Sequence, residues 1–224
     1  MSYIETLDKV QKENIGQIIC AMEEKGIVNI YTRAAILSVI SKESSFKPKN
    51  EISYRNTPND RIRLIFGAKI RMFNEDELSN LKLNEEQFFN AIYGNRYGNG
   101  PEDGFLYRGR GFNQLTFKGN YRKIANDIGI DIVKNPDLVN NIDIASKVVV
   151  QYFINNFKSM PAGFQKVYNV KYINGFESLK DAVNCMYHAN AGWGKSVNTI
   201  NADVTGGLKK AILRSTDIYN YANQ

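Results

Sequence analysis

Apolar residues recur every three or four positions in much of this chain of 224 residues, which is the spacing of one face of an α-helix. The first such stretch predicts one or two amphipathic helices that end at Gly26. A second helix is expected after Thr32 as its N-cap, and it must end before Pro48, because the residue before a proline avoids the α region. Its apolar stripe consists of Ile36, Val39 and Ile40.

Capping signals predict further helices along the chain. Thr57 is expected as an N-cap, with Pro58 at the first helical position and Asp60 in the first turn. Asn84, with a glutamine three residues later, predicts a helix that stops at Gly94. Additional helices are expected at 120–128, 143–157, 178–190 and 206–221, with Asp143 and Ser178 as caps.

Between these helices, residues 94–105 are rich in glycine and asparagine and predict an exposed loop, followed by one or two short strands near 103–115. The predicted fold class is therefore mainly α within an α+β architecture, a helical domain with a small β-hairpin region beside a substrate cleft. Without a visible linker or repeat, residues 1–224 are expected to form a single domain, and we expect a monomer.

The composition limits the compartment and the cofactors. The first residues carry scattered charges and no long apolar run, so we expect synthesis in the cytoplasm of the producing cell without a signal peptide, and no stable membrane insertion. Cys20 and Cys185 lie far apart and predict reduced, buried thiols instead of a disulfide or zinc cluster. With one histidine, the chain offers few metal ligands, and neither a metal nor a cofactor is expected. The formal net charge of +6 predicts attraction to polyanions in general.

Glu43 is the first candidate catalytic residue. It lies seven residues after Ile36, about 20° from it on an ideal helix, and so falls on the apolar stripe near the end of the second helix. A carboxyl group there should be partly desolvated and keep a proton near neutral pH, as a general acid requires. The alternative is a structural ion pair between Glu43 and a buried arginine such as Arg110.

Glu51 is the second candidate, because it follows in an extended stretch from which it could face Glu43 across a cleft. A solvated loop charge is the alternative explanation. Asp60 competes for the same role, but its position at the start of a helix already explains it.

The stretch Tyr107–Thr116 alternates glycine with arginine and ends in amide and hydroxyl side chains of the kind that bind sugars or orient water. A basic turn that binds phosphate or structural carboxylates is the alternative. The longer block YRGRGFNQLTFKGNY, at 107–121, closely resembles the YRGRG-x-x-QLT-x-x-x-NY block of family 19 chitinase-like glycoside hydrolases, especially the bacteriophage endolysins of that family.

Other landmarks of the family occur in the same order, so the resemblance covers about residues 32–195. They are Glu43-Ser44-Ser45-Phe46, Glu51-Ile52-Ser53-Tyr54, Tyr93-Gly94-Asn95-Arg96, Gly98-Asn99-Gly100, Asp103-Gly104 and, near the C-terminus, Asn190-Ala191-Gly192. The stretch at 50–54 differs from the family's Glu-Asn-Leu-Asn-Tyr, which leaves a neighbouring acid as the alternative to Glu51.

The resemblance implies a lysozyme-like fold and a role for each matching residue. Glu43 matches the general acid, Glu51 the base that activates water, and Thr116 the hydroxyl that holds this water. Positions associated with sugar binding or cleft structure match Tyr54, Tyr107, Arg110, Gln114, Tyr121 and Asn190. Family 19 enzymes resemble inverting glycosidases, in which acid and base stand about 6.5–9.5 Å apart.

The function expected from this resemblance is that of an endolysin, which hydrolyses β-1,4 bonds between the amino sugars of peptidoglycan at the bacterial cell wall. Chitin is the alternative substrate, and a non-catalytic module that binds cell wall or another polyanion keeps the fold without the activity. A cysteine peptidase built on Cys185 and His188 is disfavoured because both residues lie on one predicted helix. Nucleic-acid binding through Arg108 and Arg110 is motivated by charge alone, and we expect no nucleic-acid partner.

Overall fold

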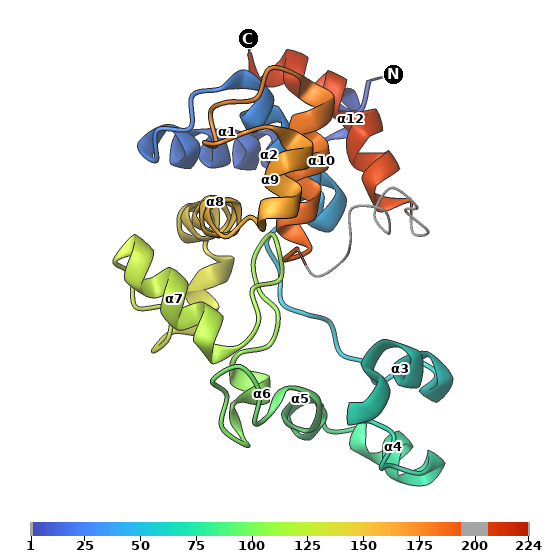
Figure 1. Ribbon diagram of the computed structural model, residues 1–224. Coiled ribbons are helices and arrows are strands. Elements are labelled where there is room, and N and C mark those ends of the chain that lie inside the picture. The colour runs from blue at the N-terminus through green and yellow to red at the C-terminus, as the bar shows by residue number, and fades with distance from the viewer. Residues whose placement is uncertain (1, 194–205, 224) are drawn as a thin grey trace. The chain divides into compact units, whose positions relative to one another are not determined.

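The computed structural model describes residues 2–193 and 206–223 and is mainly helical (Figure 1). By its internal packing the chain divides into two compact units, one formed by residues 1–48 and 141–224 and the other by residues 49–140. The mainly α fold class is confirmed, whereas a single catalytic domain spanning 1–224 stays a prediction. Two residues of the family resemblance, 194 and 195, lie outside the described residues.

The first unit is built around helix α2 (Ile30–Ser44). Its described elements are η1 (Ile4–Thr6), α1 (Lys9–Glu24), α2, α8 (Ile142–Lys158), α9 (Ala162–Tyr168), α10 (Leu179–Asn190) and α12 (Gly207–Ala222). Helices α10 and α12 both pack against α2, as Figure 1 shows. Every residue from Ala34 to Ser41 is consequently buried, so α2 is buried on all sides where the sequence predicted a single stripe.

Several helix boundaries differ from the sequence predictions. The N-cap of α2 is Asn29, whose side chain accepts a hydrogen bond from the backbone N–H of Thr32, so Thr32 lies inside the helix. Helix α8 is capped by Asn141 instead of Asp143. The caps predicted at Asn84 and Ser178 are confirmed.

The second unit consists of short helices joined by loops. They are α3 (Asn59–Phe66), η2 (Gly67–Lys69), α4 (Glu75–Leu81), α5 (Glu85–Tyr93), α6 (Asp103–Leu106), α7 (Lys118–Ile128) and η3 (Pro136–Asn140). The N-cap of α3 is Pro58, and not Thr57 as the sequence predicts. Part of the core of this unit is an apolar cluster formed by Ile62, Ile70, Leu78, Phe88, Phe89 and Ile92. Tyr54, Phe66 and Tyr93 pack against this cluster.

The predicted β-hairpin region is smaller in the structure than in the sequence analysis. The bridge between Arg110 and Leu115 is antiparallel, with N···O distances of 3.2 and 2.8 Å, and it is the β-pairing found among the described residues. The start of the predicted strand range instead forms α6. The left-handed backbone of Gly111 and Gln114 turns the chain back between the two bridge residues.

The two thiols are free, as predicted, but only Cys185 is buried, whereas Cys20 is exposed on α1. In the described part of the chain, no helix has the length and apolar character needed to cross a membrane.

Candidate active site

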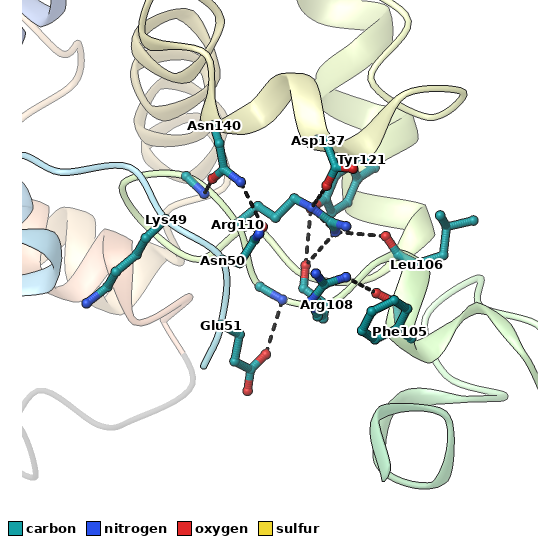
Figure 2. Close-up of polar contacts among 12 residues, drawn as sticks. Lys49, Asn50, Glu51, Phe105, Leu106, Arg108, Arg110, Tyr121, Asp137 and Asn140 are labelled. Atoms are coloured by element: carbon teal, nitrogen blue, oxygen red, sulfur yellow. Dashed lines mark hydrogen bonds and ion pairs between the residues drawn. The ribbon is translucent and has the colours of Figure 1, made fainter. Parts of the chain in front are cut away.

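The carboxylate of Glu51, in the second unit, is held by three hydrogen-bond donors. Its Oε1 accepts from the hydroxyl groups of Tyr93 at 2.9 Å and Tyr54 at 3.1 Å. Its Oε2 accepts from the backbone N–H of Gly109 at 3.1 Å (Figure 2). The Glu51 backbone N–H also donates to the Gly109 carbonyl at 2.7 Å. Both carboxylate oxygens are therefore engaged, and the orientation of the group is fixed by its own unit.

The two tyrosines act as donors because their phenols remain protonated. Burial, and then the nearby charge of Glu51, raise the pKa of both Tyr54 and Tyr93 well above the usual value. Their rings pack among the aromatic side chains of Phe66, Phe88 and Phe89. The alternative explanation of Glu51 as a solvated loop charge therefore does not hold.

Gly109 allows the loop to approach Glu51. A Cβ atom at this position would lie 2.8 Å from Oε1 of Gln114 and 3.2 Å from Oε2 of Glu51. A larger residue at this position would therefore have to displace the end of the Gln114 side chain, and it would press on the Glu51 carboxylate. The glycine at position 109 of this block is thus explained by its close contact with Gln114 and Glu51.

Arg110 stabilises the loop from inside. Its side chain is only 2% exposed, and its Nε pairs with the carboxylate of Asp137 at 2.8 Å (Figure 2). Its Nη1 donates to the carbonyl oxygens of Leu106 at 2.8 Å and Arg108 at 3.3 Å. These contacts assign Arg110 to loop structure, and its predicted direct contact with substrate is not supported.

Tyr107 and Tyr121 are also buried, at 3% and 0% exposure. The hydroxyl of Tyr107 donates to the carbonyl of Val133, and that of Tyr121 donates to the carbonyl of Arg108. Burial raises the pKa of Tyr121 to about 12, so this phenol also stays a donor. The sequence assigned these two tyrosines to sugar binding or cleft structure, and their burial with hydroxyls bonded within the fold favours cleft structure.

Thr116 and Gln114 are partly buried and lie at the end of the same loop. The Thr116 hydroxyl donates to the Gln114 carbonyl at 2.8 Å, which leaves its lone pairs as acceptors. The Gln114 side chain donates to the Lys49 carbonyl at 3.0 Å and lies beside Gly109. The second unit thus brings Gln114 close to the loop that holds Glu51.

Glu43, in the first unit, lies in the last turn of α2 with its side chain 26% exposed. The predicted partial burial is confirmed. Its Oε1 contacts Nζ of Lys42 at 2.8 Å and accepts a hydrogen bond from the Asn190 amide at 3.3 Å. The cation paired with Glu43 is thus its neighbour Lys42, while Arg110, proposed as the alternative partner, pairs with Asp137.

Asn190 is fixed by the end of α10. Its carbonyl accepts a hydrogen bond from the Tyr152 hydroxyl at 3.1 Å, and the neighbouring Ala189 carbonyl accepts one from Asn156 at 3.0 Å. Burial is the main cause that raises the pKa of Tyr152, and the charge of Glu43 adds to it. Glu43, Asn190 and Tyr152 therefore form one polar cluster within the first unit.

Cys185 and His188 do not form a reactive pair. Burial raises the pKa of the Cys185 thiol, so the nucleophilic thiolate is disfavoured. Burial also lowers the pKa of His188 to about 4, and its Nδ1 is in contact with the Tyr168 hydroxyl. Among the described residues, no group of three or more histidine, cysteine, aspartate or glutamate side chains is arranged to hold a metal ion.

Three residues of the site received no role from the sequence alone: Tyr93, Gly109 and Lys42. Tyr93 and Gly109 belong to the quoted family landmarks, but their contacts with Glu51 span 42 and 58 residues. Lys42 could have been suspected from its position beside Glu43.

Comparisons with known proteins identify the family of the chain. The family model of glycoside hydrolase family 19, described as chitinase class I, matches residues 84–218. A "Glycosyl hydrolase family 19 domain-containing protein" of Haemophilus influenzae is 31% identical over 180 residues, which cover 77% of this chain and 80% of the relative. The solved structure of chitinase C from Streptomyces griseus HUT6037 has a similar fold, with a TM-score of 0.52 and 15% identity over 95% of this chain and 69% of that chain.

Fold and family model together define a mainly helical domain of the glycoside hydrolase class. The chain belongs to glycoside hydrolase family 19. Its substrate is therefore a polysaccharide.

Proposed function

We propose that this protein hydrolyses the β-1,4 bonds between amino sugars of peptidoglycan, in the manner of an endolysin, and acts at the bacterial cell wall. Family membership supports glycan hydrolysis, and the resemblance of residues 107–121 to phage endolysins supports the choice of wall polymer. The net charge of +6 favours capture of an anionic wall over a neutral polymer.

In the proposed mechanism, Glu43 donates a proton to the glycosidic oxygen and Glu51 removes a proton from the attacking water. Water forms the new bond to the anomeric carbon as the leaving sugar departs, so the anomeric configuration inverts and no covalent intermediate forms. The Thr116 hydroxyl, which still has acceptor capacity, holds the water.

The observation that carries the proposal is the three-donor arrangement around the Glu51 carboxylate. A base that takes a proton from water must be held in one orientation, because catalysis by proton transfer depends on hydrogen-bond geometry. A solvated loop glutamate would not be held by two partly buried tyrosine hydroxyls and a glycine N–H.

Chitin hydrolysis is the second candidate function, favoured by a specific observation. The matching family model is described as chitinase class I, and the similar solved structure is a chitinase. Both polymers share β-1,4-linked N-acetylglucosamine, so the same two carboxylates would serve either substrate.

Mass spectrometry of fragments released from purified peptidoglycan, with chitin oligomers in parallel, tests the proposal. We expect glycan fragments with new reducing ends from peptidoglycan, and NMR of the first product should show the inverted anomer. Glu43→Gln and Glu51→Gln variants serve as controls and should release little. Anhydro ends would indicate a transglycosylase, free peptides a peptidase or amidase, and cleavage of chitin alone a chitinase; binding without cleavage would indicate a cell-wall-binding module.

A further inference from the structure

Tyr97 is an exposed aromatic residue with an unusual backbone. Its side chain belongs to the loop between α5 and α6, and the residue is 69% exposed. Its φ angle is +45°, in the left-handed region that bulky residues rarely adopt. Such strain in a non-glycine residue persists only where the surrounding structure enforces it, and it occurs often at ligand sites.

A hydrogen bond from the first turn of α7 holds the backbone of Tyr97. The backbone N–H of Gly119 donates to the Tyr97 carbonyl at 3.0 Å. A Cβ atom on Gly119 would lie 2.6 Å from this carbonyl oxygen, and one on Gly98 would lie 3.0 Å from the Gly119 nitrogen. The two glycines therefore permit a backbone contact that fixes the direction in which the Tyr97 side chain leaves the loop.

The ring of Tyr97 is contacted by two side chains, those of Phe117 and Arg96. The ring centroid of Phe117 lies 4.8 Å away, and the guanidinium carbon of Arg96 lies 5.5 Å from the Tyr97 ring centroid. Arg96 is itself anchored by a hydrogen bond from its Nη1 to the Ile92 carbonyl at 3.1 Å. The ring is thus oriented before any ligand arrives, so little entropy is lost on binding.

Aromatic packing also connects Tyr97 with Glu51, the proposed base. Phe117 contacts the ring of Tyr93 edge to face, with centroids 5.3 Å apart, and the Tyr93 hydroxyl binds Glu51 at 2.9 Å. All these residues lie in the second unit. Two ring contacts therefore connect the exposed Tyr97 to the residue that holds Glu51.

We propose that Tyr97 is a stacking platform for one pyranose ring of the glycan substrate, and so forms a sugar subsite in the second unit. The apolar C–H face of a β-1,4-linked amino sugar matches a flat, rigid aromatic surface, and binding sites combine such surfaces with a few fixed polar groups. The inference rests on the proposed glycan hydrolysis, since the ligand is a part of that substrate.

The test measures glycan binding by the full chain carrying Glu43→Gln, so that the ligand is not consumed. Isothermal titration calorimetry with chitohexaose and with peptide-free glycan strands from peptidoglycan gives the Kd. Tyr97→Ala, which keeps the same backbone strain, should raise the Kd about twofold to tenfold, whereas Tyr97→Trp should bind as the parent does. The matched control is Tyr172→Ala, because Tyr172 is similarly exposed, at 66%, but lies in the first unit.

Unchanged binding by Tyr97→Ala would overturn the platform, as would an equal loss in Tyr172→Ala or a parent that binds neither glycan. Thermal unfolding of each variant shows that a loss of binding is not a loss of fold. Hydrolysis by the wild-type chain is measured separately. If the wild type releases no reducing ends while Tyr97→Ala still weakens binding, the proposed function fails and the sugar platform stands.

Discussion

The hydroxyl of Tyr93 donates a 2.9 Å hydrogen bond to Oε1 of Glu51, although the two residues are 42 positions apart. Tyr93 ends helix α5, and its ring is stacked on Phe89 within the core of the second unit. The orientation of the proposed base therefore depends on the packing of a helix that carries no catalytic group itself.

Tyr93→Phe removes this hydrogen bond and keeps the ring. We expect kcat/KM on the glycan substrate to fall about tenfold or more, since a hydrogen bond to a charged group contributes about 1.5–3 kcal/mol. The loss should fall on kcat, because Tyr93 positions Glu51 and does not bind substrate. In a Glu51→Gln background, the added effect of Tyr93→Phe should largely vanish. Equal losses in both backgrounds would show that Tyr93 acts independently of Glu51.

Gly109→Ala should displace Glu51 or Gln114, because the new methyl group would lie 2.8 Å from Oε1 of Gln114 and 3.2 Å from Oε2 of Glu51. We expect a loss of activity that exceeds any loss of stability. Gly16→Ala is the matched control, because Gly16 lies in helix α1 and nothing lies within 4 Å of the added Cβ atom. This variant should be more stable by up to about 1 kcal/mol and keep full activity. Steady-state kinetics and urea unfolding distinguish the two variants, and a fully active Gly109→Ala would contradict the tight fit.

Arg110→Met should destabilise the protein by about 2–5 kcal/mol, because it leaves the carbonyls of Leu106 and Arg108 without this buried donor. Asp137→Ala should cost less, about 1 kcal/mol, since the Asp137 side chain is 83% exposed and Arg110 keeps its carbonyl partners. Urea unfolding of both variants gives the comparison. A larger effect from Asp137→Ala would mean that the ion pair, and not the carbonyl contacts, stabilises the loop.

His188 should make the protein sensitive to acid. Its pKa is lowered by burial from 6.5 to about 4, so between these values the unfolded chain binds a proton that the folded chain excludes. Stability is therefore expected to fall as the pH decreases from about 6.5 to about 4. His188→Gln should be less stable overall near neutral pH but lose less stability across this range. If the free energies of unfolding of the wild type and of His188→Gln change equally with pH, His188 does not contribute to the acid sensitivity.

The sequence predicted the elements whose signals are local. Asn84 and Ser178 cap their helices as expected, because a capping side chain binds a backbone N–H only three residues away. Local signals did not locate the N-cap of α2 correctly. Asn29 and Thr32 are both good capping residues, and which of them caps the helix depends on where the chain turns. The burial of α2 on all sides follows from α10 and α12, which periodicity within α2 cannot reveal.

The site was predicted in part for the same reason. The partial burial of Glu43 follows from its position on the helix and is confirmed. Arg110 lies between two glycines and had the pattern of an accessible basic turn, but Asp137 and Tyr121, from later elements, enclose it. Catalytic roles for Glu43, Glu51 and Thr116 stay predictions until activity is measured.

Release of reducing ends from purified peptidoglycan by the Glu43→Gln variant tests whether Glu43 supplies the proton for glycan hydrolysis. Glu24→Gln, an exposed change at the end of α1, is the matched control. With both variants folded as judged by circular dichroism, we predict a loss of at least about a hundredfold for Glu43→Gln, the scale of general acid catalysis, and none for Glu24→Gln. Wild-type activity in folded Glu43→Gln would show that Glu43 does not supply this proton.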